Sequence, residues 1–482
     1  MNTESNLSDE FICSSVAHIL AAIDLTDNAD PARASLITKI KSIPENFGAW
    51  NNLGNLLFDA GLTNAAHTAY SAAITFRPKE AAGHANLANL LLYTNNFKAA
   101  KEHYDIALSL EPDLPGIHQG LASYYQTQGE LDSARYHQER GYGVQPVSYT
   151  SYWGTGEPIP IVILISALGG NIPWRLMLDR SAFQAIVVAA EYFDRRLSLP
   201  PHRLIFNTIG EADLCRLGLE AALRLVQDET APVINHPAAV LKTGRMMNAE
   251  RMARLPGVIT PRMALFAKSM LMEDNGEAVL ARQGFAFPLL LRSPGFHGGE
   301  HFVSVSAPNA LNEALRGLPG DELFAIERLD SRSADGLFRK YRVMSIDGVL
   351  YPMHLAITTQ WKTHYFTSDT AGNEAHRREE AAFLKDFSAV MGPDALAALK
   401  GISRELGLEY CGIDFGIDSH GNVLLYESNA TMVITPPSFE NELGYRNHAV
   451  ANALAAAERM LSARCKSQLA STVVHPAPDG ER

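Results

Sequence analysis

Small and apolar residues recur every 34 positions along residues 1–146. Leu53-Gly54, Leu87-Ala88 and Leu121-Ala122 occupy one register, and two other registers hold prolines and alanines, at Pro44, Pro78, Pro112 and Pro146 and at Ala32, Ala66, Ala100 and Ala134. Small residues suit the points where two helices touch, large residues fill the gap between them, and proline ends a helix. The pattern therefore predicts a stack of helix-turn-helix repeats.

The period, the prolines, the alanines and the start of the first full unit at Trp50 resemble the tetratricopeptide repeat. Complete units are expected at 47–80, 81–114 and 115–148, and a degenerate unit at about 13–46 is expected to act as a cap. The resemblance implies an all-α superhelix that binds a peptide or protein partner. Dimerisation, giving a homodimer, is the alternative use of such a stack.

The composition changes after Pro146. Residues 147–158 break the 34-residue register and are predicted to be a linker. Beyond them, short apolar runs alternate with an amphipathic helix at 212–227, and the runs lie at 161–166, 185–190, 203–207 and 232–235. Such runs are typical of buried parallel strands. A small α/β layer is therefore expected over residues 159–236, with Gly169-Gly170-Asn171 forming a turn after its first strand.

The segment 410–429 carries the clearest chemistry. Residues 418–422 are turn formers between two strand-like runs, which predicts a hairpin. A turn centred between His420 and Gly421 places Asp414 opposite Glu427, with Asn429 on the same face. Three oxygen ligands in this arrangement suit Mg²⁺ better than zinc, and Mn²⁺ is the alternative. Gly412 and Gly416 flank Asp414 and are expected to leave space beside it.

Two other segments bring cations beside flexible backbone. Arg292 ends a strand-like run and is followed by a glycine-bearing loop with His297, Gly298 and Gly299. Glycines let backbone N–H groups approach phosphate oxygens closely. Lys340 and Arg342 share one face of a second strand, which ends in the turn pair Asp347-Gly348. Each segment alone is also compatible with a solvated strand.

In this order, the segments at about 160–460 resemble the ATP-grasp family of carboxylate–amine ligases, particularly the glutathione-synthetase-like branch. The resemblance implies an α/β pre-ATP-grasp domain at 159–236, an α+β ATP-grasp domain at 237–465 and a flexible tail at 466–482. It also assigns residues to ATP: Arg245 and Arg292 to the phosphates, the loop residues His297, Gly298 and Gly299 above them, and Ile326, Glu327, Arg328 and Leu329 to the adenine. The metal ligands are then Asp414, Glu427 and Asn429.

Two positions depart from the family pattern, because Arg245 and Arg292 stand where lysines are common. A guanidinium keeps the charge but is planar and bulkier than an ammonium. Lys242 is an alternative for the first cation, because the register before Met246 is ambiguous by a few residues.

The reaction implied by the resemblance begins with attack of a carboxylate on the γ-phosphate of ATP. An amine then displaces phosphate from the acyl phosphate, giving an amide (or an ester, with an alcohol). Lys340 and Arg342 would meet the acyl phosphate, and His354 or His364 is a candidate general base. Four functions stay open: a ligase on peptides or proteins, a ligase on a small metabolite, a non-catalytic nucleotide-binding adaptor and a phosphotransferase.

The net charge and the cysteine content of the chain limit which of its possible partners and locations are expected. The chain of 482 residues has a formal net charge of -12, which disfavours a surface built for nucleic acid or anionic lipid. Its four cysteines form no CxxC pair, and the polar N-terminus and short apolar runs predict neither a secretory signal nor a membrane span. A cytoplasmic protein that binds neither nucleic acid nor membrane is expected, with cations concentrated at one nucleotide site.

Overall fold

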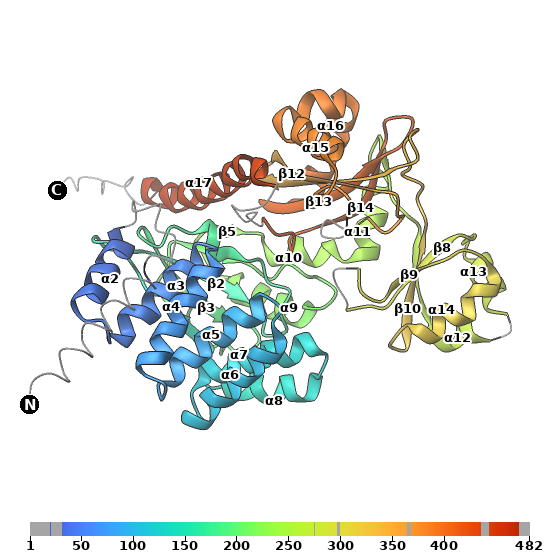
Figure 1. Cartoon of the computed structure of the whole chain (residues 1–482). Helices are drawn as coiled ribbons and strands as arrows, with labels where there is room; N and C mark the ends of the chain where they lie inside the picture. Colours follow the sequence, from blue (N-terminus) through green and yellow to red (C-terminus); the bar gives the residue numbers. More distant parts are fainter. Residues whose placement is uncertain are drawn as a thin grey trace, which may run out of the picture. The chain divides into compact units, whose positions relative to one another are not determined.

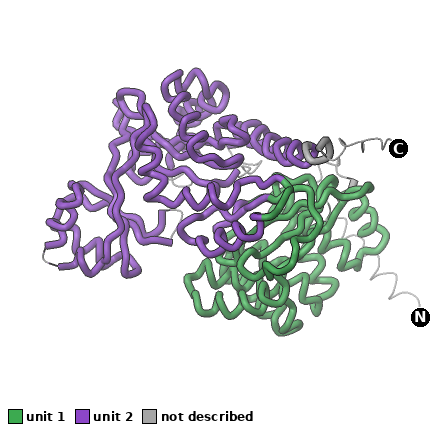
Figure 2. The backbone as a smooth tube through the Cα atoms, turned by 180° about the vertical axis from the view of Figure 1, so that it is seen from behind, with its two compact units in different colours: residues 1–169, 173–205, 228–231 green, residues 170–172, 206–227, 232–482 purple. Residues whose placement is uncertain are grey.

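The computed structural model describes residues 20, 31–273, 275–295, 299–363, 368–434 and 443–471. The chain divides into two compact units (Figure 2). Unit 1 holds residues 1–169, 173–205 and 228–231, and unit 2 holds residues 170–172, 206–227 and 232–482. The repeats and the first strands of the α/β layer therefore form one unit, where the sequence had suggested a boundary in the linker.

Unit 1 begins with antiparallel helix pairs, which Figure 1 shows in blue to cyan. The helices are α2 (Pro31–Ser42), α3 (Phe47–Asp59), α4 (Thr63–Phe76), α5 (Ala81–Tyr93), α6 (Phe97–Leu110), α7 (Pro115–Gln128) and α8 (Leu131–Gly141). The pairs α3–α4, α5–α6 and α7–α8 lie within the three predicted repeat units. The prediction of a helical repeat stack is confirmed. Residues 13–19 and 21–30, in the predicted cap, lie outside the described residues.

Small residues hold the repeat helices together at close range. A Cβ on Gly54 would lie 2.5 Å from the ring of Tyr70, and a Cβ on Gly120 would lie 2.6 Å from the ring of Tyr104. Both tyrosines are fully buried. The aromatic ring of one helix therefore occupies the space that a side chain on its partner would need.

The repeated prolines do more than end helices. The indole Nε1 of Trp50 donates to the carbonyl of Pro44 at 2.8 Å. His84 contacts the carbonyl of Pro78 at 3.0 Å through Nε2, and His118 contacts that of Pro112 at 2.8 Å in the same way. A ring nitrogen six residues after each proline thus satisfies a carbonyl left free at a helix end.

The strands of unit 1 form the order β1–β3–β2. β2 (Ile159–Ile165) and β3 (Phe183–Ala189) are parallel, as the apolar runs predicted. β1 (Val147–Tyr149) pairs antiparallel with β3. Residues 147–149 are therefore an edge strand and not linker, because Val-Ser-Tyr can alternate between two faces of a sheet while β3 offers an open edge. The short 3-10 helix η1 (Trp174–Met177) follows β2.

β4 (Leu204–Asn207) spans the boundary between the units, and the rest of the α/β layer belongs to unit 2. It comprises α9 (Arg216–Val226), β5 (Val233–Ile234), α10 (Pro237–Val240), η2 (Leu241–Thr243) and α11 (Arg245–Met252). Each predicted strand and the predicted helix of this layer is present. Among the helices within the described ranges, none combines the length and apolar character needed to span a bilayer.

A small antiparallel sheet of order β7–β10–β8–β9 follows in unit 2. Its strands are β7 (Met263–Ala267), β8 (Leu289–Arg292), β9 (Phe302–Val305) and β10 (Glu322–Glu327). Three helices and the 3-10 turn η3 (Pro308–Ala310) accompany it: α12 (Lys268–Met272), α13 (Gly276–Arg282) and α14 (Leu311–Gly317). Their buried side chains, including Phe266, Leu291 and Leu315, form one core.

A five-stranded sheet of order β12–β11–β13–β14–β6 completes unit 2 (Figure 1). Its strands are β6 (Val258–Ile259), β11 (Phe338–Ile346), β12 (Val349–Thr358), β13 (Tyr410–Ile417) and β14 (Val423–Asn429). The helices α15 (Glu374–Lys385), α16 (Phe387–Leu406) and α17 (Asn447–Ser471) pack on this sheet, and the 3-10 helix η5 (Gly444–Arg446) leads into α17. Asp347 and Gly348 both have positive φ and form the predicted β11–β12 turn.

Candidate functional site

The β13–β14 hairpin places Asp414 directly opposite Glu427. The turn position that was expected for this register differs from the one in the structure. Ile417 pairs with Val423, which centres the turn on His420, and a one-residue bulge after Asp414 then shifts the register. The bulge leaves Tyr426 as the extra residue on β14, and it restores the pairing that the sequence predicted.

Asp414 lies between two cations of the neighbouring strand β11. Its side chain is 1% exposed, and Arg342 donates to it through Nε at 2.6 Å and Nη2 at 2.8 Å. Lys340 Nζ lies 2.6 Å from Oδ2. Burial opposes ionisation here, but Arg342 and then Lys340 hold the pKa of Asp414 well below its usual range. The two cations that the resemblance implies for the acyl phosphate therefore neutralise Asp414 in this structure.

Glu427 is paired in the same way by Arg245, whose Nη2 lies 3.0 Å from Oε1. The amide Nδ2 of Asn429 donates to the same oxygen at 3.1 Å, which confirms that Asn429 shares the face of Glu427. Burial opposes ionisation, yet Arg245 lowers the pKa of Glu427 overall. Arg245 borders this site directly, whereas Lys242 is not among the described residues that line either cavity here.

The glycines that flank Asp414 were expected to leave space beside it, but in the structure they do not. A Cβ on Gly412 would lie 2.4 Å from the Cβ of Met432, and one on Gly416 would lie 2.4 Å from the hydroxyl oxygen of Tyr426. Both positions are filled by neighbouring side chains. These glycines therefore admit Met432 and Tyr426 to the strand surface and do not open a ligand space.

A cavity of unit 2 has a volume of about 250 Å³, and we call it the main cleft. Its lining includes apolar side chains, among them Leu290, Ile326, Leu329 and Phe338. It also includes three carboxylates, those of Glu327, Asp414 and Glu427, and six cations: Arg245, Arg292, Arg328, Lys340, Arg342 and Lys362. One cavity thus offers apolar surface that suits a flat ring and cations that suit phosphates.

Most of the residues assigned to ATP meet in the main cleft. Gly299, Glu327 and Arg328 line it together with Ile326, Leu329 and Arg292. Burial, followed by the charge of Arg245, lowers the pKa of Arg292 to about 10, so its guanidinium is protonated at neutral pH. His297 and Gly298 lie outside the described residues.

Lys362 is a cation of the main cleft that the sequence did not single out. Its Nζ lies 3.3 Å from the carbonyl of Phe302, and its Cε would lie 2.9 Å from a Cβ on Gly299. The preceding Trp361 packs edge-on against Phe302 with ring centroids 5.4 Å apart. In the sequence, Trp361 and Lys362 stand shortly after a long strand, and this was the only hint of a role for them. The sequence did not show that the segment carrying Lys362 packs beside Gly299.

The structure describes only one of the two histidines that were considered as general bases. His354 lies on β12 opposite Arg342 and is buried. Burial, followed by the charge of Arg342, holds its pKa well below the usual value, and it is not among the described residues that line the main cleft. His364 lies outside the described residues.

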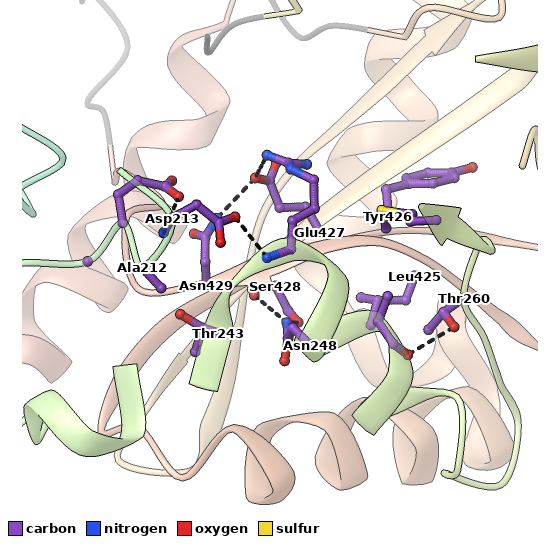
Figure 3. Close-up of a pocket in the computed structure, with 15 residues that line it drawn as sticks. Ala212, Asp213, Thr243, Asn248, Thr260, Leu425, Tyr426, Glu427, Ser428 and Asn429 are labelled. Carbon is purple, nitrogen blue, oxygen red and sulfur yellow. Dashed lines mark hydrogen bonds and ion pairs between the residues drawn. The ribbon is translucent and has the colours of Figure 1, made fainter. Parts of the chain in front are cut away.

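A second cavity shares four lining residues with the main cleft, namely Arg245, Met263, Tyr426 and Glu427. We call it the acidic pocket, because Glu211 and Asp213 line it together with Glu427 (Figure 3). Burial, followed by the charge of Glu427, raises the pKa of Glu211 to about 7. Sequence reasoning missed both acids, because Gly210-Glu211-Ala212-Asp213 looks like an ordinary loop before a helix.

The donor set on the hairpin fits Mg²⁺ by its chemistry. Two carboxylates face each other, and the Asn429 amide lies beside one of them, which supplies only hard oxygen ligands. Within the described part of the chain, no group of three His, Cys, Asp or Glu side chains is arranged to hold a metal ion. Any metal site here therefore needs the amide, waters or phosphate oxygens to complete it.

Comparisons with known proteins agree with the helical repeats. Residues 81–114 match the tetratricopeptide repeat family model. Among curated proteins, none matches the chain. Solved structures similar to it include the D-Ala:D-Ser ligase VanG from Enterococcus faecalis, at 12% identity and a TM-score of 0.39 over 64% of this chain and 100% of that one. A RimK domain ATP-grasp protein from Sphaerobacter thermophilus shows 15% identity and a TM-score of 0.37, over 64% of this chain and 99% of that one.

Proposed function

We propose that the chain is an ATP- and Mg²⁺-dependent ligase of the cytoplasm that joins a carboxylate to an amine through an acyl phosphate. The observation that carries the proposal is the β13–β14 hairpin, with Asp414 opposite Glu427 and Asn429 beside it. Asp414 and Glu427 of this hairpin line the main cleft, whose lining also includes apolar side chains. ATP likewise combines an adenine ring, which suits apolar surface, with a charged triphosphate.

Asp414, Glu427 and Asn429 would hold Mg²⁺, which neutralises charge on the phosphates when bound. Arg245 and Arg292 bind the triphosphate, and Lys340 and Arg342 stabilise the charge that develops on the acyl phosphate. No protein nucleophile is required, because the carboxylate of the substrate attacks the γ-phosphate itself. The protein positions both reactants for the two steps.

The ion pairs of the main cleft give this proposal a specific consequence. Arg342 and Lys340 neutralise Asp414, and Arg245 neutralises Glu427. With a divalent cation held by the carboxylates, Arg342, Lys340 and Arg245 would be available to bind phosphate oxygens. Metal and triphosphate therefore support each other's binding, since each satisfies the partners that the other displaces.

The repeats give the proposed ligase a surface for a peptide or protein substrate. Several large side chains of α5, α6 and α8 are exposed, including Tyr93, Ile106, Leu131 and Tyr136. Such side chains commonly contribute to protein interfaces. The competing function, a ligase acting on a small metabolite, does not need this surface for turnover.

The test is mass spectrometry of a cell extract incubated with the full chain, ATP and Mg²⁺. We expect one ATP-dependent amide product, and its mass tells whether the product is a peptide. Glu427→Ala should abolish that product and ATP consumption while the circular dichroism spectrum stays that of the wild type. Wild-type turnover in this variant would contradict the assignment of Glu427 to the metal.

A further inference from the structure

The acidic pocket shares part of its lining with the main cleft. Figure 3 shows Asp213, Glu427 and Asn429 around this cavity, and Arg245 and Glu427 line both spaces. The segment 326–329, assigned to adenine, lines the main cleft but is not among the described residues of the acidic pocket. A group bound in the acidic pocket would therefore lie beside Arg245 and Glu427, which are proposed to hold phosphate and metal.

Two glycines bring the pocket walls together. A Cβ on Gly210 would lie 3.0 Å from the backbone of Ala430 and Thr431, so the loop carrying Glu211 lies close to the end of β14. A Cβ on Gly244 would lie 2.6 Å from Oδ1 of Asp213, whose other oxygen accepts a bond from the backbone N–H of Arg245 at 2.9 Å. The acids are thus held in place by close backbone packing.

Glu211 is a buried carboxylate that forms no ion pair with another described residue. The residue is only 9% exposed, and its Oε1 accepts a long hydrogen bond of 3.4 Å from the backbone N–H of Asp213. The charge of Arg245 favours the ionised form of Glu211, but the guanidinium itself is paired with Glu427. A buried carboxylate without a counter-ion is unfavourable, and a bound cation relieves it.

A second buried group in the same pocket also lacks a partner. Asn248 is 5% exposed and gives both bonds of its Nδ2 to the carbonyl and hydroxyl of Ser428, at 2.7 and 2.8 Å. Its Oδ1 is buried and has no hydrogen-bond partner within the described part of the chain. The pocket lining therefore combines an unpaired carboxylate with an unpaired amide oxygen, and both accept hydrogen bonds.

The size of the pocket limits the ligand. Its volume is about 30 Å³, enough for about two water-sized groups. A primary ammonium group is about the size of a water molecule, whereas a planar guanidinium is several times larger. Charge, hydrogen-bonding capacity and volume thus select a primary ammonium group.

We propose that the acidic pocket binds the ammonium group of the acyl acceptor, with Glu211 as its main anion and Asp213 at its entrance. This inference rests on the proposed ligase function and names its nucleophile as a primary amine. One proton passes from the ammonium to Glu211, and the nitrogen lone pair then attacks the carbonyl carbon of the acyl phosphate. The C–N bond forms, the C–O bond to phosphate breaks with its electron pair on phosphate, and the second proton leaves with phosphate.

Glu211→Gln tests the proposal in the full chain, with cell extract, ATP and Mg²⁺ as reactants. We expect phosphate release to continue, because the acyl phosphate still forms and is hydrolysed, while amide product per phosphate falls at least about ten-fold, the effect of losing about 1.4 kcal/mol of transition-state binding. Asp213→Asn should give a smaller fall. Glu220→Gln on α9 is the matched control and should behave as the wild type.

Hydroxylamine gives the second readout, because it is an uncharged nucleophile near neutral pH and needs no ammonium site. It should yield as much hydroxamate with Glu211→Gln as with the wild type. An unchanged ratio of product to phosphate in Glu211→Gln would overturn the acceptor site alone. Loss of phosphate release or of AMP-PNP binding in this variant would assign Glu211 to ATP or metal and would also overturn it. A wild type without any ATP-dependent product would overturn the ligase proposal itself.

Discussion

Replacing Asp414 with asparagine removes one charge from a buried cluster of three. The side chain of Asp414 is 1% exposed, whereas those of Arg342 and Lys340 are 25% and 20% exposed. Breaking a buried ion pair by removing one partner typically costs about 3–5 kcal/mol. Because both cations can turn partly toward water, we expect Asp414→Asn to destabilise the ligand-free β11–β13–β14 region by about 3 kcal/mol, the lower end of that range.

Hydrogen exchange measured by mass spectrometry on peptides from β13 reports this local stability without assuming that the whole chain unfolds at once. Asp394→Asn, which removes the same charge from an exposed side chain of α16, is the matched control and should change stability by less than about 1 kcal/mol. Adding Lys340→Met to Asp414→Asn should recover about 1 kcal/mol, because it removes an uncompensated cation. An unchanged opening free energy in Asp414→Asn would refute the view that these cations depend on Asp414.

Two further predictions concern the repeats. Gly120→Ala should lower the thermal midpoint of the full chain, at a cost of about 1–3 kcal/mol, because its Cβ would meet the buried ring of Tyr104. Gly116→Ala on the same helix meets nothing within 4 Å and should be neutral or slightly stabilising; equal effects of the two would contradict the close-packing argument. Burial, followed by the charge of His118, lowers the pKa of His137 to about 4, so the folded state binds this proton less readily than the unfolded state does. The contribution of His137 to the free energy of unfolding is therefore fully present above about pH 6.5 and falls as the pH drops toward about 4. Chemical denaturation at several pH values in this range measures how the free energy of unfolding depends on pH. That dependence should be weaker in His137→Gln, and an identical dependence would exclude the effect.

The β13–β14 hairpin was predicted from sequence in its residue pairing but not in its turn position. The pairing of Asp414 with Glu427 follows from turn chemistry and the two-residue period of a strand, and the structure has that pair. The turn itself is centred on His420, and the bulge at Tyr426 corrects the difference. A bulge depends on how a strand fits its neighbours, so local sequence does not reveal it.

The charge state of the site was less accessible from sequence. Lys340 and Arg342 were expected to bind a phosphate, and both side chains contact Asp414 in the structure, which confirms that they share one strand face. Glu211 lies more than 200 positions before Glu427 in the chain, and the pocket that they share arises only when the loop at Gly210 packs against the end of β14. Lys362 likewise reaches the main cleft through a loop between distant strands.

The sequence by itself determined the repeat stack, the strands and helix of the α/β layer at 159–236, and the hairpin that carries the carboxylates. Those features follow from periodicity and turn chemistry, which act between residues close in the chain. Only the tertiary structure decided which cation meets which carboxylate, that residues 147–149 complete a sheet edge, and that no described cation forms an ion pair with Glu211. Electrostatic pairing and burial depend on distances in space between segments far apart in sequence, and no local pattern encodes them.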